Sequence, residues 1–145
     1  MKIPTKDTEG RDNGWICPVW NALEHPELRP EQVYVTAIAP RSRKGPHLHM
    51  KRRGLFFVIS GKVVIMAVYP GVGVKHTTME PGDNGVIVNS GAPCALYNYG
   101  DTEALVLNLP SPAWSKENPD DWPVEGWKDP EDWPPVIVPI PENKR

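Results

Sequence analysis

Residues 55–69 read LFFVISGKVVIMAVY, two nearly unbroken apolar runs that meet at Gly61. Short apolar runs that are rich in β-branched and aromatic residues and bounded by glycine are typical of buried strands. The sequence therefore predicts strands over 55–60 and 62–69. Since only a glycine turn separates them, we expect the two strands to pair as a hairpin.

The pattern continues on both sides of this pair. Further β-rich segments cover 33–39, 74–79, 86–89, 95–99 and 104–109, and turn signals such as Pro81-Gly82-Asp83 separate them. Short strands at a spacing of about 8–12 residues indicate a sandwich or barrel. No helical period persists for three turns. The sequence predicts a single all-β domain.

Length and composition narrow the class of protein. The chain has 145 residues, which fits one domain, and its net charge of −2 argues against binding a nucleic-acid polymer. No apolar stretch approaches the roughly 18 residues of a membrane helix. Cys17 and Cys94 are too few for a disulfide framework, so we expect two free thiols in a cytoplasmic protein.

The C-terminal part differs from the rest of the chain. From Pro110 onward it holds nine of the eighteen prolines and four of the six tryptophans. Proline at this density disfavours helix and central strand alike, whereas the tryptophans offer too much apolar area to leave in water. We expect an N-terminal arm over 1–32, a barrel over 33–109 and an extended tail over 110–145 that wraps over the barrel.

A basic segment carries the candidate chemistry. Residues 41–53 hold six lysines and arginines, two histidines and no acidic residue. In a strand, residues two apart point the same way, so His47, His49, Lys51 and Arg53 would share one face. Such a face needs water or a charged ligand if it lies inside a barrel. The alternative is an edge strand whose polar face meets solvent.

The segment Gly45-Pro46-His47-Leu48-His49, with Gly61 after the next strand, resembles the first motif of the cupins, and 82–98 resembles the second. The resemblance implies a jelly-roll barrel, the double-stranded β-helix. Metal-binding cupins carry a glutamate and a further histidine where this chain has Arg53 or Gly54 and Cys94. We expect no metal and no cofactor, with a zinc site of His47, His49 and Cys94 as the alternative.

Within the cupins, the chain resembles the RmlC-like branch. Residues 32–35 and 43–49 resemble the sugar 3,4-ketoisomerases, and 127–134 resembles the C-terminal signature of the dTDP-4-dehydrorhamnose 3,5-epimerases. The resemblance implies a metal-independent isomerase or epimerase of a nucleotide-linked 4-keto-6-deoxy sugar. It also implies a homodimer that exchanges N-terminal strands, with apolar contacts from Trp15, Val19 and Trp20.

Both enzyme classes remove a proton from a carbon next to a ketone, which needs a base and a group that holds the enolate oxygen. The resemblance implies that His47 is the base, that Asp129 orients it, and that His49 returns the proton. Tryptophans of the tail would pin Asp129 across the barrel mouth. A tyrosine that serves the epimerases as acid is replaced by Pro112-Ala113-Trp114, which favours isomerisation.

The remaining expected site residues would bind substrate. Lys44 stands where the epimerases place an arginine that holds the keto oxygen or the diphosphate, and Trp15, Trp20 and Tyr34 are candidates for stacking on the base. Tyr97 or Tyr99 would replace the missing tyrosine. The candidates for the diphosphate are the basic residues Arg41, Arg43, Lys51 and Arg53. Two other functions stay open: a non-catalytic cupin that binds an anionic small molecule, and a metal-dependent cupin enzyme.

Overall fold

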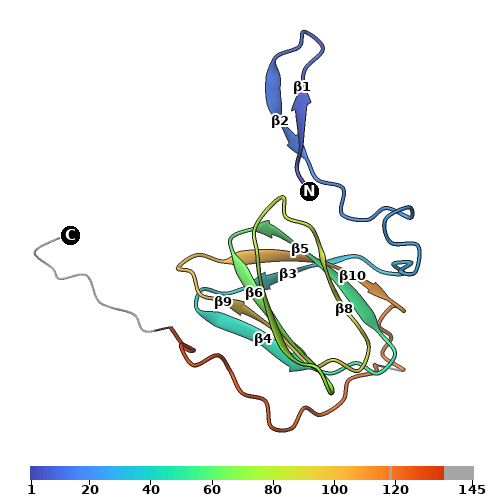
Figure 1. The fold of residues 1–145 in the computed structure, drawn as a ribbon, viewed down its shortest axis with the longest axis vertical. Coiled ribbons are helices and arrows are strands. Elements are labelled where there is room, and N and C mark those ends of the chain that lie inside the picture. The colour runs from blue at the N-terminus through green and yellow to red at the C-terminus, as the bar shows by residue number, and fades with distance from the viewer. Residues whose placement is uncertain (118, 136–145) are drawn as a thin grey trace, which may run out of the picture.

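A computed structural model describes residues 1–117 and 119–135. This part of the chain is all-β and contains no helix long and apolar enough to cross a membrane. Its ten strands (Figure 1) are β1 Ile3–Lys6, β2 Asp12–Ile16, β3 Tyr34–Ile38, β4 Ser42–His47, β5 Arg53–Ser60, β6 Val63–Tyr69, β7 Gly73–Met79, β8 Val86–Val88, β9 Cys94–Asn98 and β10 Ala104–Ser111.

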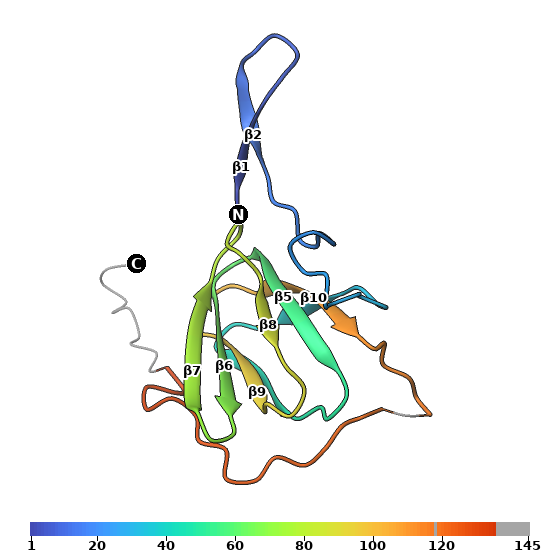
Figure 2. The same ribbon diagram turned by 45° about the vertical axis from the view of Figure 1, so that its right-hand side comes forward.

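Two four-stranded antiparallel sheets form the barrel. One has the order β3-β10-β5-β8 and the other β4-β9-β6-β7. The two sheets face each other in Figure 2, and their inner faces supply a shared core that includes Ile38, Val58, Ile65, Leu96 and Val106. Alternating residues of both sheets fill this layer, as in other β-sandwiches. The predicted all-β jelly-roll architecture is confirmed.

The predicted hairpin of 55–60 and 62–69 is wrong. β5 lies between β10 and β8, whereas β6 lies between β9 and β7, so each strand has both edges occupied by other partners. The chain therefore crosses from one sheet to the other at Gly61. Both strands are buried on the inner face of their own sheet, and the apolar run alone does not distinguish this crossover from a tight hairpin.

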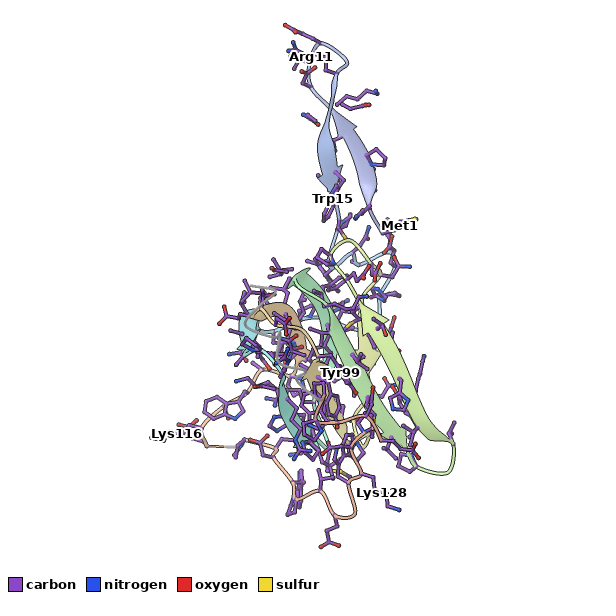
Figure 3. The ribbon with its side chains drawn as sticks, turned by 90° about the vertical axis from the view of Figure 1, so that its left-hand side faces the viewer. Met1, Arg11, Trp15, Tyr99, Lys116 and Lys128 are labelled. Carbon is purple, nitrogen blue, oxygen red and sulfur yellow. The ribbon has the colours of Figure 1, made fainter. Side chains whose placement is uncertain are left out.

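The N-terminal arm contains a hairpin that the strand pattern did not predict. β1 and β2 pair from Ile3 opposite Ile16 to Lys6 opposite Asp12 and project away from the barrel (Figures 1 and 3). Trp15 and Ile16 are about half exposed there. The hairpin thus presents apolar side chains that nothing in the described chain covers fully.

Candidate functional site

A cavity of about 380 Å³ lies inside the barrel, within the range of small-molecule sites. Strands of both sheets and the C-terminal tail line it. Its polar and ionisable lining residues are Gln32, Tyr34, Thr36, Lys44, His47, His49, Arg52, Asn89, Cys94, Asn108 and Asp121. The cavity thus joins a basic group of side chains to several uncharged hydrogen-bonding ones.

A bulge in β4 brings Lys44 and His47 to the same wall. Lys44 pairs with Leu96 and His47 with Cys94, and the register shifts between these two pairs. Gly45 makes the bulge possible, because its φ is +97° and a Cβ there would lie 2.8 Å from the Cys94 carbonyl oxygen. Residues three apart therefore both face the cavity.

The His47 imidazole is positioned to act as a base. Its ring nitrogens have no hydrogen-bond partner among the described residues, and its ring lies 6.1 Å from that of His49 at an interplanar angle of 16°. Desolvation is the largest cause that lowers the pKa of His47 below its usual 6.5, and the nearby charges of Arg52 and Lys44 lower it further. The imidazole is therefore neutral near pH 7 and has a lone pair to accept a proton.

His49 has a different environment. Its Nδ1 lies 2.9 Å from the carbonyl oxygen of Asp120, and its Nε2 lies 2.9 Å from Nη2 of Arg52. A carbonyl only accepts and a guanidinium only donates, so this network assigns the proton to Nδ1 and the lone pair to Nε2. His49 therefore holds Arg52 in place, and its own lone pair is engaged.

Arg52 lines the cavity, although the alternation of residues along a strand did not predict it as a site residue. Its side chain is only 11% exposed, and the carboxylate of Asp121 lies 3.9 Å away. β4 ends at His47 and β5 begins at Arg53, so a turn replaces the long strand that the sequence predicted. The prediction that 47, 49, 51 and 53 share one face is wrong, because the turn brings Arg52 to the cavity instead of Lys51 and Arg53.

The tail holds this turn through Asp120. The Asp120 carboxylate accepts hydrogen bonds from the backbone N–H groups of Met50, Lys51 and Arg52 at 2.9–3.1 Å and from the Trp122 indole at 3.0 Å. Burial alone would raise the pKa of Asp120, but these donors hold it well below its usual value. Asp120 has φ +54°, a left-handed conformation that aspartate adopts more readily than most residues.

Asp129 does not bond to the histidines. Its carboxylate accepts hydrogen bonds from Arg43, from the Tyr97 hydroxyl at 2.6 Å and from the Trp127 indole at 3.3 Å. Tyr97 and Trp127 belong to a cluster with Met66 and Ala95, formed apart from the inter-sheet core. The predicted hydrogen bond between Asp129 and His47 is wrong. The acidic residue beside the histidines is Asp121, 3.4 Å from Nδ1 of His49.

The tail covers a sheet face as well as one end of the barrel. Trp122 joins Leu48 in an isolated bridge next to the cavity, whereas Trp133 packs edge-on against Tyr97 and Tyr99 at 4.9 and 5.1 Å. Trp127 joins that same cluster. The expectation that the tryptophans at 122, 127 and 133 pin the tail across the barrel mouth is thus wrong for Trp127 and Trp133. Figure 2 shows the segment after β10 passing beneath the barrel.

Most of the expected substrate-binding residues lie outside the cavity. Of that set, the cavity is lined by Tyr34 and Lys44. Tyr97 of β9 and Tyr99, which follows that strand, both contact the tail. The other basic candidates bind within the chain: Arg41 pairs with Asp101, Arg43 with Asp129, and Arg53 donates to the Glu27 carbonyl. Lys51 contributes its backbone N–H to Asp120.

Cys94 lines the cavity as a buried side chain. Burial raises the pKa of its thiol to about 11, so it carries no charge near pH 7. Over 1–117 and 119–135, no three His, Cys, Asp or Glu side chains are grouped as metal ligands would be. The residues present therefore do not form the alternative site of His47, His49 and Cys94.

Comparisons with known proteins agree with this architecture. A 3,4-ketoisomerase from Helicobacter canadensis has a TM-score of 0.66 at 16% identity, over 83% of this chain and 85% of that one. A mutant of the 3,4-ketoisomerase QdtA from Thermoanaerobacterium thermosaccharolyticum, in complex with TDP-4-keto-6-deoxyglucose, has a TM-score of 0.64 at 15% identity, over 80% of each chain. At this identity, both likenesses concern the fold.

The capsular polysaccharide assembling protein CapF from Staphylococcus aureus has a TM-score of 0.58 at 26% identity, over 64% of this chain. The chain spans only 28% of the length of CapF. No protein of curated function matches the sequence. The family model described as Cupin matches residues 4–111, which is well over half of the sequence and includes the whole barrel. The chain therefore belongs to the cupin family.

Proposed function

We propose that this cupin is an isomerase or epimerase of a nucleotide-linked 4-keto-6-deoxy sugar and that it removes a proton from the carbon next to the ketone. The observation that carries the proposal is His47, a histidine with a lowered pKa, on the wall of the cavity and without a hydrogen-bond partner among the described residues. Cupins of the same fold are described as sugar 3,4-ketoisomerases, one of them bound to TDP-4-keto-6-deoxyglucose.

The reaction requires a base and a group that stabilises the enolate. Neutral His47 takes the proton, and negative charge then develops on the ketone oxygen. Arg52 and Lys44 line the cavity with positive charge, and either side chain stabilises the negative charge on the oxygen. His49 acts as a positioning residue, because its Nε2 holds Arg52.

The proposal favours isomerisation over epimerisation. Epimerisation needs an acid on the opposite face of the sugar, and the two tyrosines considered for that role, Tyr97 and Tyr99, bond to tail carboxylates instead. In an isomerase, the neighbouring hydroxyl passes its proton to the enolate oxygen and becomes the new ketone. The protonated His47 then delivers its proton to the former ketone carbon, on the face from which it took one. His49 is not needed for that step, since its lone pair is engaged.

Incubation with dTDP-4-keto-6-deoxyglucose in heavy water tests the proposal. Deuterium that enters the sugar supports proton removal by the protein. Tight binding without exchange would instead support a non-catalytic cupin for anionic small molecules, a function that the nearly buried Arg52 also favours. Mass spectrometry of the recovered sugar distinguishes the two outcomes, and heat-denatured protein is the control for exchange in solution.

We further infer that the protein is a homodimer in which the β1–β2 hairpin of one copy packs on the other. Ile3, Trp15 and Ile16 are 46%, 46% and 55% exposed on a hairpin that projects from the barrel. An isolated two-stranded hairpin is only marginally stable in water, so a second copy would bury these side chains.

A further inference from the structure

The cavity has an uncharged wall formed by Asn108 of β10 and Tyr34 of β3. The two residues are directly opposite in the antiparallel pair of these strands, and both line the cavity. The Asn108 amide donates from Nδ2 to the Tyr34 hydroxyl at 2.6 Å. Both side chains come from the sheet β3-β10-β5-β8, whereas His47 belongs to the facing sheet. A ligand in the cavity would therefore meet both groups.

The other amide atom of Asn108 has no partner. Asn108 is 6% exposed, and among the described residues its Oδ1 is the buried side-chain polar atom without a hydrogen bond. Buried acceptors are almost always satisfied, because an unmet one loses the hydrogen bond that water gave it. The Tyr34 hydroxyl already accepts from Asn108, so its own proton remains for another acceptor.

Gly54 of β5 keeps space beside this oxygen. A Cβ at position 54 would lie 3.0 Å from Asn108 Oδ1 and 2.9 Å from Cε2 of Phe56. The backbone of Gly54 is outside the left-handed region, so its conformation does not require glycine. The crowding around a Cβ does require it, because glycine at this position leaves room for the Asn108 amide beside Phe56.

We propose that Asn108 and Tyr34 form a subsite for one hydroxyl group of the bound sugar. The hydroxyl donates to Asn108 Oδ1 and accepts from the Tyr34 phenol, so both vacant hydrogen-bonding positions are filled by one group. A ketone and an ionised carboxylate have no proton to donate, and an ammonium has no lone pair to accept with. The subsite rests on the proposed function for the identity of its ligand as a sugar, and it determines which sugar the cavity accepts.

Calorimetric titration of the full chain with dTDP-glucose and its 2-, 3- and 4-deoxy analogues tests the subsite. We expect the wild type to bind one analogue at least tenfold more weakly than the parent, which is about 1.4 kcal/mol. Asn108→Ala should bind that analogue and the parent equally. Tyr34→Phe keeps the ring and should lose part of the preference, whereas Val35→Ala, on the exposed face of β3, should keep all of it.

The possible results test the proposed subsite and the proposed reaction separately. Wild-type protein that binds every analogue as tightly as the parent would overturn the subsite, even if deuterium exchange occurs. Discrimination without exchange would overturn the proposed reaction and support the subsite. If no sugar nucleotide binds, both are overturned. Melting curves of Asn108→Ala and Tyr34→Phe show whether each variant is folded. If Asn108→Ala does not fold, the conservative variant Tyr34→Phe tests the subsite.

Discussion

Replacement of Asp120 by asparagine should loosen the connection between the tail and the cavity. Oδ2 of Asp120 accepts from the N–H groups of Lys51 and Arg52, and Oδ1 accepts from Met50 and the Trp122 indole. Asparagine has one oxygen, so it keeps at most two of these four hydrogen bonds. At about 1 kcal/mol for each bond in a half-buried turn, the loss is about 2 kcal/mol.

Differential scanning calorimetry measures this loss. At about 3 °C per kcal/mol for a chain of this length, the Tm of Asp120→Asn should fall by about 6 °C. Asp132→Asn is the matched control, because Asp132 is an exposed residue of the same tail that accepts one hydrogen bond, from Tyr99 at 3.0 Å. A Tm for Asp120→Asn that falls no further than that of the control would refute the reasoning.

The difference in stability between wild type and Asp120→Asn should depend on pH. Because the folded state lowers the pKa of Asp120 below its usual value of 3.8, the carboxylate contributes its full stabilisation above that value. The contribution is lost as the pH falls through the lower folded pKa. The difference in stability between wild type and Asp120→Asn should therefore be constant above about pH 5 and shrink only in stronger acid.

Three further outcomes are expected. Because the pKa of His47 is lowered, the acid limb of kcat/KM should lie below pH 6.5, and a limb at or above that value would exclude His47 as the base. Asp129→Asn should cost about 1–2 kcal/mol of stability, read from Tm, and leave exchange nearly unchanged; a large loss of exchange would restore its predicted catalytic role. Deletion of 1–16 should halve the mass measured by light scattering, and an unchanged mass would contradict the dimer.

The strands could be predicted from the sequence because burial on a sheet leaves a local pattern. Every apolar run between 33 and 109 became a strand, with bounds shifted by a residue or two. Their pairing could not be predicted this way. β5 and β6 are adjacent in sequence yet lie in different sheets, since a strand is placed by the partners that cover its two edges.

The site residues could be predicted where side chains alternate between the two faces of a strand. They could not be predicted where a bulge or a turn interrupts that alternation. The bulge at Gly45 interrupts the alternation, so that Lys44 lies with His47 on the cavity wall and Arg43 pairs with Tyr97 and bonds to Asp129. The turn after His47 then brings in Arg52.

The contacts of the C-terminal tail could likewise be predicted only in part. Its tryptophan content predicted that it packs on the barrel, as the cluster around Trp127 and Trp133 confirms. Which aspartate meets which strand depends on the path of a segment without regular structure, and short motifs do not define that path. The tail does bring an acidic group to the histidines, but this group is the Asp121 carboxylate, and Asp120 meets His49 through its backbone carbonyl.

The most direct test of the central claim is deuterium exchange into dTDP-4-keto-6-deoxyglucose by His47→Asn. Asparagine cannot act as a general base, so exchange should fall by about 10²–10⁴-fold, with the fold and the binding of dTDP retained. His76→Asn is the control, because His76 is exposed on β7 and does not line the cavity. A His47→Asn protein that exchanges deuterium at the rate of His76→Asn would contradict the assignment of His47 as the base.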